Sequence, residues 1–201
     1  MRNPQVRRTK KLLFQALIEL MRRKPYNKIT IQDLVSEAEL SRTAYYTHYE
    51  SLNEVLLDYL GILYRSYIEH SLSPDRTTPL TQYENNKLLL QGYWNDREIY
   101  VLLRKNNLDH LAYIAKMNNY DLTSQLVSRT LMDNLDDVDL YYSIYTPYHR
   151  EAENKLIMEW LSEPQPKSID YMASLITSIS GIDVYNAFKA QYYRMAPPDE
   201  I

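Results

Sequence analysis

The chain has 201 residues, of which 45% are hydrophobic and 24% are charged, with a net charge of −3 and no cysteine. This composition is that of a globular domain, and it excludes a disordered chain, a disulfide-stabilised fold and thiol chemistry. With only three glycines and nine prolines, a sheet built on tight turns is disfavoured. The sequence has no run of 18 apolar residues and no signal-peptide core, so we expect a cytoplasmic protein without a membrane partner.

Charge is unevenly divided along the chain. Residues 1–50 hold ten Lys/Arg and five Asp/Glu, a net charge of +5, so the remaining residues carry −8. A basic N-terminal segment attached to an acidic remainder is typical of a small nucleic-acid-binding domain joined to a second domain. Chance clustering of solvated surface charges is the alternative.

Helical periodicity dominates the N-terminal part of the sequence. The first helices are expected at about 5–24, 30–38, 41–47 and from Ser51 to about Ser73. In the first of them, Leu13, Leu17 and Leu20 form an apolar stripe, and Pro25 ends the helix.

The same periodicity continues to the C-terminal end. Further helices are expected at about 79–92, 96–105, 108–133, 138–162 and 168–194. Thr78 followed by Pro79 predicts the start of the helix at 79–92. Pro147 must start, kink or interrupt the helix at 138–162. No strand pattern or repeat is present, so the predicted fold class is all-α.

Residues 30–49 carry the start and stop signals of a helix-turn-helix. Thr30 is a good N-cap with an acid three residues on, and Ser41 caps the next helix. Ser51 with Glu54 forms a capping box, so the chain re-enters helix at once.

The second helix of this motif carries polar side chains that can reach a DNA duplex. Arg42 lies in the first turn, where a bidentate contact to guanine is worth about 1–3 kcal/mol of discrimination. Thr43 and Tyr46 share a helical face and can touch a thymine methyl or a phosphate oxygen. His48, just past the helix, and Thr30, at a helix N-terminus, can bind phosphates.

Each of these candidates has a structural alternative. Arg42 and His48 could be ordinary solvated surface, Tyr46 could be core, and Thr30 could be a cap alone. Ser41 is more simply a cap. Tyr45 and Tyr49 face the other way and are expected to pack against the first helix.

The quoted residues resemble the N-terminal domain of the TetR/AcrR family of bacterial transcriptional regulators. The resemblance covers about residues 8–57 and rests on the Thr-capped helix, Leu40-Ser41-Arg42-Thr43, the run Tyr45 to Tyr49 and the Ser51 box. It implies a three-helix DNA-binding domain at 1–52, with its helix-turn-helix at 30–49. It also implies a helical effector-binding and dimerisation domain at 53–201.

The family likeness implies further properties. Arg42, Thr43 and Tyr46 match base-contacting positions, and Thr30, Tyr46 and His48 match phosphate contacts. Together with Ser41 they are the DNA-binding candidates. The likeness implies a homodimer that binds a palindromic double-stranded DNA operator and responds to a small-molecule effector, most simply as a repressor.

Two positions depart from the family pattern. The usual turn glycine is Glu39, which implies either a different turn or a non-glycine residue at positive φ. The usual phosphate-binding lysine at the start of the fourth helix is Leu52, a loss of about one salt-dependent contact. The stretch Lys155 to Leu161, followed by Ser168, resembles the C-terminal domain common in Firmicutes members.

Two sets of residues are predicted in the second domain. The effector pocket candidates, chosen by position, are Tyr93, Trp94, Tyr113 and Met117. The dimer interface candidates, from the apolar faces of the last long helices, are Leu156, Trp160, Ile176 and Ile179. For the second set, the alternative is a core within one chain.

The sequence shows no sign of catalysis. It lacks a glycine-rich phosphate loop, a nucleophile elbow and a metal-ligand pair, and its four histidines are far apart. Asp136, Asp137 and Asp139 lack the alternating ligands and glycine of a calcium loop. We therefore expect no enzyme, no cofactor and no metal. The alternative to a promoter-specific regulator is a DNA-binding or protein-interaction module that does not regulate a promoter.

Overall fold

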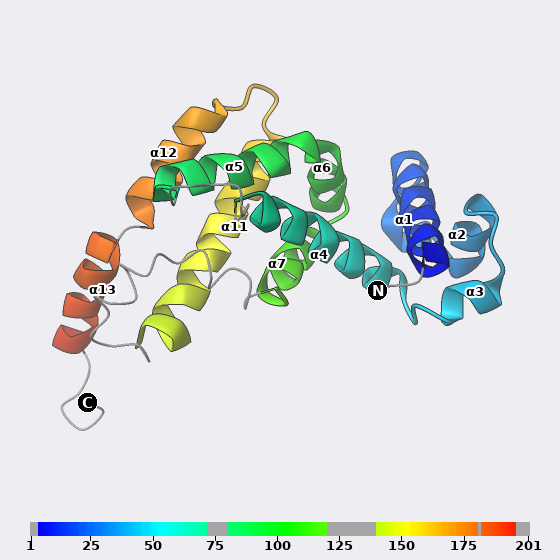
Figure 1. The fold of residues 1–201 in the computed structure, drawn as a ribbon, viewed down its shortest axis with the longest axis horizontal. Coiled ribbons are helices and arrows are strands. Elements are labelled where there is room, and N and C mark those ends of the chain that lie inside the picture. Colours follow the sequence, from blue (N-terminus) through cyan, green and yellow to red (C-terminus); the bar gives the residue numbers. More distant parts are fainter. Residues whose placement is uncertain (1–3, 72–79, 120–139, 181, 196–201) are drawn as a thin grey trace. The chain divides into compact units, whose positions relative to one another are not determined.

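The computed structural model describes residues 4–71, 80–119, 140–180 and 182–195, and every regular element in these ranges is a helix (Figure 1). The predicted all-α fold class is thereby confirmed. The chain divides into two compact units. The first holds the residues up to Ser66 together with Asp96–Asn119, and the second holds Tyr67–Asn95 with the described residues after 139. No described helix is long and apolar enough to cross a membrane.

The first unit is built on the N-terminal helices. It contains α1 (Pro4–Arg23), the 3-10 turn η1 (Tyr26–Lys28), α2 (Ile31–Glu37), α3 (Arg42–Tyr46), most of α4 (Leu52–Ser71), α6 (Arg97–Lys105) and α7 (Asp109–Met117). Its core includes the fully buried side chains of Leu13, Leu17 and Leu34, which lie on the inward faces of α1 and α2. The first four helices are confirmed to within a residue or two of their predicted ends.

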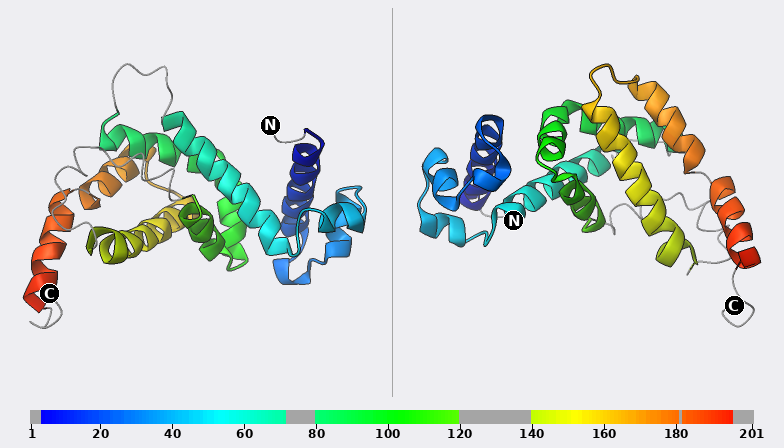
Figure 2. Two further views of the ribbon diagram at one scale, coloured as in Figure 1. Left: turned by 60° about the horizontal axis from the view of Figure 1, so that its bottom comes forward. Right: turned by 180° about the vertical axis from the view of Figure 1, so that it is seen from behind.

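The second unit is built on the later helices. It contains α5 (Gln82–Asn95), the π-helical turn η2 (Tyr141–Tyr145), α11 (Thr146–Ser162), α12 (Ile169–Ile179) and α13 (Ile182–Met195). Helices α5 and α12 lie side by side in Figure 1 and in both views of Figure 2. Gly92 of α5 lets the ring of Tyr67 approach closely, because an added Cβ would meet its ring carbons at 2.4 Å and 2.6 Å.

Two predicted helix ends in the middle of the chain are wrong. Helix α5 begins at Gln82, where the hydroxyl of Thr81 accepts from the Glu84 backbone N–H at 3.3 Å and the Glu84 carboxylate accepts from the Thr81 N–H at 2.8 Å. This capping box sets the start of α5, three residues after the predicted one. Thr78-Pro79 itself lies outside the described residues. The predicted helix 108–133 ends at Met117, where Asn118 is the C-cap. The acidic run Asp133–Asp139 also lies outside the described residues.

The last two predicted helices need smaller corrections. The described backbone is already helical from Leu140 through the π-helical turn, and Pro147 lies in the first turn of α11 directly after it. Of the three alternatives, Pro147 therefore interrupts the regular helix and does not start it. The predicted helix 168–194 is in fact two helices. Ser168 caps α12 through the Tyr171 N–H, as predicted, but α12 ends at Ile179 and α13 begins at Ile182. The intervening Ser180-Gly181 is a sequence that commonly ends a helix.

The contact-based units and the predicted functional domains are divided differently. The first unit extends along α4 to Ser66 and includes α6 and α7, whereas the predicted DNA-binding domain ends at residue 52. Compactness and function are separate criteria, so the 1–52 and 53–201 division remains a proposal.

Candidate nucleic-acid interface

The start of α2 is fixed by a reciprocal capping box. The Thr30 hydroxyl accepts from the Asp33 backbone N–H at 3.1 Å, and the Asp33 carboxylate accepts from the Thr30 N–H at 2.8 Å. Lys24 lies 2.7 Å from the same carboxylate, and this ion pair, with the Thr30 hydrogen bonds, holds the pKa of Asp33 well below its usual range. The Thr30 hydroxyl donates its one proton to Asp33 at 2.7 Å. Because its hydroxyl already donates to and accepts from Asp33, Thr30 is more simply a helix cap than a phosphate contact.

The turn between α2 and α3 contains a residue in the left-handed region. Glu39 has φ 53°. Of the two predicted alternatives, the structure therefore shows a non-glycine residue at positive φ and not a different turn. A side chain in this conformation carries a steric cost of roughly 1–2 kcal/mol, which glycine avoids. Ser41 follows in extended conformation, and its exposed hydroxyl accepts from the Ala44 N–H at 3.1 Å. The predicted cap is confirmed.

The two faces of α3 differ sharply in exposure. Tyr45 is fully buried and Tyr49, just after the helix, is 5% exposed, whereas Tyr46 is 56% exposed. The prediction that Tyr45 and Tyr49 face inward is confirmed, and the core alternative for Tyr46 is wrong. Arg42 and Thr43 are exposed beside Tyr46, and His48 is half-buried. The structure therefore brings the predicted DNA-reading side chains together on the outer side of α3.

A polar network that the sequence did not predict joins α3 to two other helices. The Tyr49 hydroxyl donates to Asp58 Oδ2 of α4 at 2.7 Å, and Lys10 Nζ of α1 donates to the same oxygen at 2.8 Å. The Lys10 ammonium also lies 5.0 Å from the centre of the Tyr49 ring. Burial and the hydrogen bond to Asp58 raise the pKa of Tyr49. These contacts fix the C-terminal end of the recognition segment against α1 and α4.

Two further contacts hold α6 and the turn after it against the N-terminal helices. The Arg22 guanidinium binds both carboxylate oxygens of Glu98, at 2.6 Å and 2.7 Å. The Tyr26 backbone N–H donates to the Asn106 side-chain oxygen at 2.8 Å. Such pairs link residues 76 and 80 positions apart, and no local sequence signal reports them.

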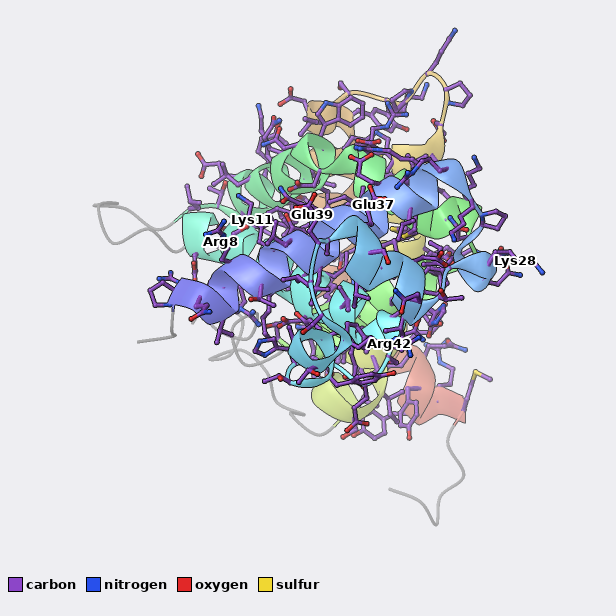
Figure 3. All side chains as sticks on the ribbon, turned by 90° about the vertical axis from the view of Figure 1, so that its right-hand side faces the viewer. Arg8, Lys11, Lys28, Glu37, Glu39 and Arg42 are labelled. Carbon is purple, nitrogen blue, oxygen red and sulfur yellow. The ribbon has the colours of Figure 1, made fainter. Side chains whose placement is uncertain are left out.

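The basic side chains of residues 4–50 fall into two groups. Those of Lys10, Arg22, Arg23 and Lys24 are engaged in ion pairs with Asp58, Glu98, Glu37 and Asp33. Five others are exposed and form no ion pair with any described residue, namely Arg7, Arg8, Lys11, Lys28 and Arg42. In the view of Figure 3, Lys28 lies at one side, Arg8 and Lys11 lie at the other, and Arg42, Glu37 and Glu39 lie between. Within residues 4–50, this second group offers free cationic groups to phosphates.

The predicted pocket residues are distributed over both units. In the second unit, Tyr93 is 3% exposed and lies 5.3 Å from the Tyr67 ring, and Trp94 lies 5.3 Å from the Trp160 ring. Tyr113 and Met117 are half-buried residues of α7 in the first unit. The structure describes each pair within its own unit, so a pocket shared by all four remains a prediction.

The predicted dimer residues differ in how much surface they offer. Trp160 and Ile176 are each 2% exposed, so packing within the chain already accounts for them. The Trp160 indole N–H donates to the Lys167 carbonyl oxygen at 2.7 Å. Ile179 is 37% exposed and Leu156 is half-buried, which leaves these two with surface for a partner. The interface itself remains a prediction.

The described residues contain no group of three or more His, Cys, Asp or Glu side chains arranged to hold a metal ion. No family model and no curated protein matches the sequence. Among solved structures, the chain is similar to a TetR transcriptional regulator from Streptococcus agalactiae 2603V. The TM-score is 0.56 and the identity 20%, over 86% of this chain and 95% of that chain. This chain has the TetR regulator fold.

This fold agrees with the one that the resemblance of residues 8–57 implies, and the structural similarity covers 86% of the chain. At 20% identity the likeness establishes the fold and transfers no residue's role. The contact of Arg42, Thr43 and Tyr46 with DNA stays a prediction, and the structure contributes their exposure on α3.

Proposed function

We propose that this chain is a sequence-specific DNA-binding transcriptional regulator. The observation that carries the proposal is the exposed row of Arg42, Thr43 and Tyr46 on a short helix whose opposite face, Tyr45, is fully buried. Polar side chains on the outer face of a rigidly held helix are what base reading in a major groove requires. A core role would not leave the ring of Tyr46 56% exposed.

In this proposal some side chains contact bases and others contact phosphates. Arg42 reads a guanine through a bidentate contact, and Thr43 and Tyr46 make apolar and polar contacts beside it. The unpaired cations Arg8 and Lys28, with the half-buried His48 ring, bind phosphates and set the register. Residues 1–52 are the proposed DNA-binding domain, and residues 53–201 the effector-binding and dimerisation domain.

The finer proposal is a ligand-responsive repressor that acts as a homodimer. Two α3 helices would enter successive major grooves about 34–36 Å apart, so the operator would be a palindrome. An effector would release the DNA by binding better to a dimer with another spacing of its recognition helices. The TetR-like fold and the exposed Ile179 and half-buried Leu156 support this arrangement.

The test is a footprint and gel shift on the DNA that flanks this protein's own gene. We expect one discrete palindromic site whose binding weakens steeply with salt. Arg42→Ala should weaken binding about tenfold or more and relax the preference at one base pair. Lys28→Ala should weaken all sequences about equally and reduce the salt slope by about one. Lys105→Ala, an exposed lysine at the end of α6, is the matched control and should bind as wild type does.

The second candidate is a DNA-binding or protein-interaction module without a promoter target. Leu52, at the first residue of α4 in place of a phosphate-binding lysine, is the observation that favours it. Weak binding without a discrete site, equal in wild type and Arg42→Ala, would support this candidate and overturn the regulator.

A further inference from the structure

The turn between α2 and α3 is formed by its backbone and makes no use of the Glu39 side chain. The Leu40 N–H donates to the Val35 carbonyl oxygen at 2.9 Å. The Glu39 N–H donates to the Ser36 carbonyl oxygen at 3.2 Å. These two hydrogen bonds, with φ 53° at Glu39, are those of a Schellman motif, in which the residue at positive φ is usually glycine. Glycine would therefore form the same turn at a lower steric cost.

The Glu39 side chain makes no contact that would explain its presence in this turn. It is exposed, and its carboxylate forms no hydrogen bond or ion pair with any described residue. The neighbouring acid Glu37, in contrast, is paired with Arg23. Asn107 is the other non-glycine residue at positive φ in the described part of the chain, and asparagine tolerates this region. Backbone strain that no structural contact explains commonly marks a functional residue, and Glu39 fits this description.

Glu39 lies on the surface that is proposed to bind DNA. In the view of Figure 3, Glu39 and Arg42 both lie between Lys28 on one side and Lys11 on the other. Positions 39 and 42 are three residues apart, so their Cα atoms are separated by no more than about 11 Å, or about three base steps of 3.4 Å. The Glu39 carboxylate can therefore reach base edges within about three base pairs of the base that Arg42 contacts.

We propose that Glu39 determines sequence specificity by accepting a hydrogen bond from the N4 amino group of a cytosine. An ionised carboxylate accepts hydrogen bonds and donates none. In the major groove guanine and thymine present only acceptors, and adenine presents its amino group beside the N7 acceptor. Cytosine presents an amino group alone, so it suits a carboxylate best. Elsewhere the carboxylate loses water without gaining a partner and is repelled by phosphates, so other sequences are disfavoured. This inference rests on the proposed function.

The experiment measures the affinity of the full-length protein for its footprinted operator and for a random-sequence duplex of equal length. Fluorescence anisotropy at several salt concentrations supplies both values. Glu39→Gln removes the charge and keeps the side-chain length and the positive φ. Its affinity for the random duplex should rise several-fold, and the ratio of operator to random affinity should fall about tenfold. Glu151→Gln, the same change at an exposed position of α11, is the matched control and should bind both duplexes as wild type does.

A second measurement identifies the base that Glu39 contacts. Operators are prepared with one base pair changed at a time, symmetrically in both half-sites. Wild type should lose affinity about tenfold when one particular cytosine is replaced, within about three base pairs of the guanine that Arg42→Ala identifies. Both Glu39→Gln and Glu39→Gly should lose the preference for that cytosine. Since glycine removes the backbone strain and glutamine keeps it, the same loss in both variants cannot come from a change in the turn.

Three results would overturn the proposal, and they differ in what they leave standing. A discrete operator that Glu39→Gln binds with the wild-type ratio and base preferences overturns cytosine reading and leaves the regulator intact. A lowered ratio with unchanged base preferences indicates a general repulsion of phosphates, and it also overturns cytosine reading alone. If wild type has no discrete site, the regulator fails and cytosine reading fails with it. The first two results keep the discrete site and the Arg42→Ala defect, and the third lacks both.

Discussion

Glu39 offers a direct test of how the helix-turn-helix is built, because its φ of 53° is unfavourable for any residue with a Cβ. The steric cost of that conformation is roughly 1–2 kcal/mol, and Glu39→Gly removes it. Glycine gives back about 0.5–1 kcal/mol through the larger entropy of the unfolded chain. The free energy of unfolding should therefore rise by about 0.5–1 kcal/mol, which raises the unfolding temperature by about 1–4 °C in a chain of this size.

The assay is thermal and urea unfolding of the full-length protein, followed by far-UV circular dichroism. Because the chain forms two compact units, the transition assigned to the first unit is the one to compare. Glu39→Gln is the control, since it removes the charge and keeps the strained backbone. A glycine variant that is no more stable than the glutamine variant would refute the assignment of strain to this position. Asn107, with φ 58°, should gain less from glycine, because asparagine tolerates this region better.

Further predictions concern the core and the caps. Tyr45→Phe removes a buried hydroxyl without a described partner and should leave stability unchanged or raise it by about 1 kcal/mol. Burial raises the pKa of Tyr45 to about 12. The stability that this shift contributes is therefore present below about pH 10 and is lost as the pH rises through 12. Urea titrations over this pH range should show a smaller loss of stability in the phenylalanine variant. Gly92→Ala drives a Cβ into the Tyr67 ring and should cost about 1–3 kcal/mol, measured as a lower urea midpoint. Thr30→Ala should cost about 1 kcal/mol by the same measurement. The pKa of Asp33 is lowered in the folded protein, so its contribution to stability is present above about pH 4 and is lost as the pH falls through the folded-state pKa. The free energy of unfolding of Asp33→Asn should therefore fall less steeply at acid pH than that of wild type.

Helix ends were predictable where one local side chain determines them. Thr30 and Ser41 cap their helices as predicted, and α1 ends before Pro25. The start of α5 differs from the prediction, although Thr81 and Glu84 stand at capping-box spacing in the sequence. Thr78-Pro79 offers a second start signal three residues earlier, and the sequence alone does not rank the two. The division of the last helix at Ser180 depended on reading Ser-Gly as a stop within an otherwise regular apolar pattern.

The contacts that position the recognition helix were beyond reach of the sequence. Lys10 and Asp58 meet across 48 residues, and Arg22 and Glu98 meet across 76. Pairing at such distances depends on how the helices pack, and in the sequence each partner is one of many charged residues. For the same reason, the count of ten basic residues in the first 50 overstates the number of cations that are free to bind DNA. Several of them are neutralised within the fold.

The energetics of base reading support the proposed homodimer independently of the fold. Specific protein–DNA complexes exceed non-specific binding by about 4–10 kcal/mol. Helix α3 has five residues, and Arg42 is the only one with a long side chain that can make a bidentate base contact, worth about 1–3 kcal/mol. The free cations, Arg8 and Lys28 among them, add affinity but no discrimination, because phosphates are the same at every base pair. One copy of this surface falls short of the usual specificity, whereas two copies on a palindrome double the base contacts and approach it. A variant that stays monomeric should therefore keep salt-dependent DNA binding and lose most of its preference for the operator.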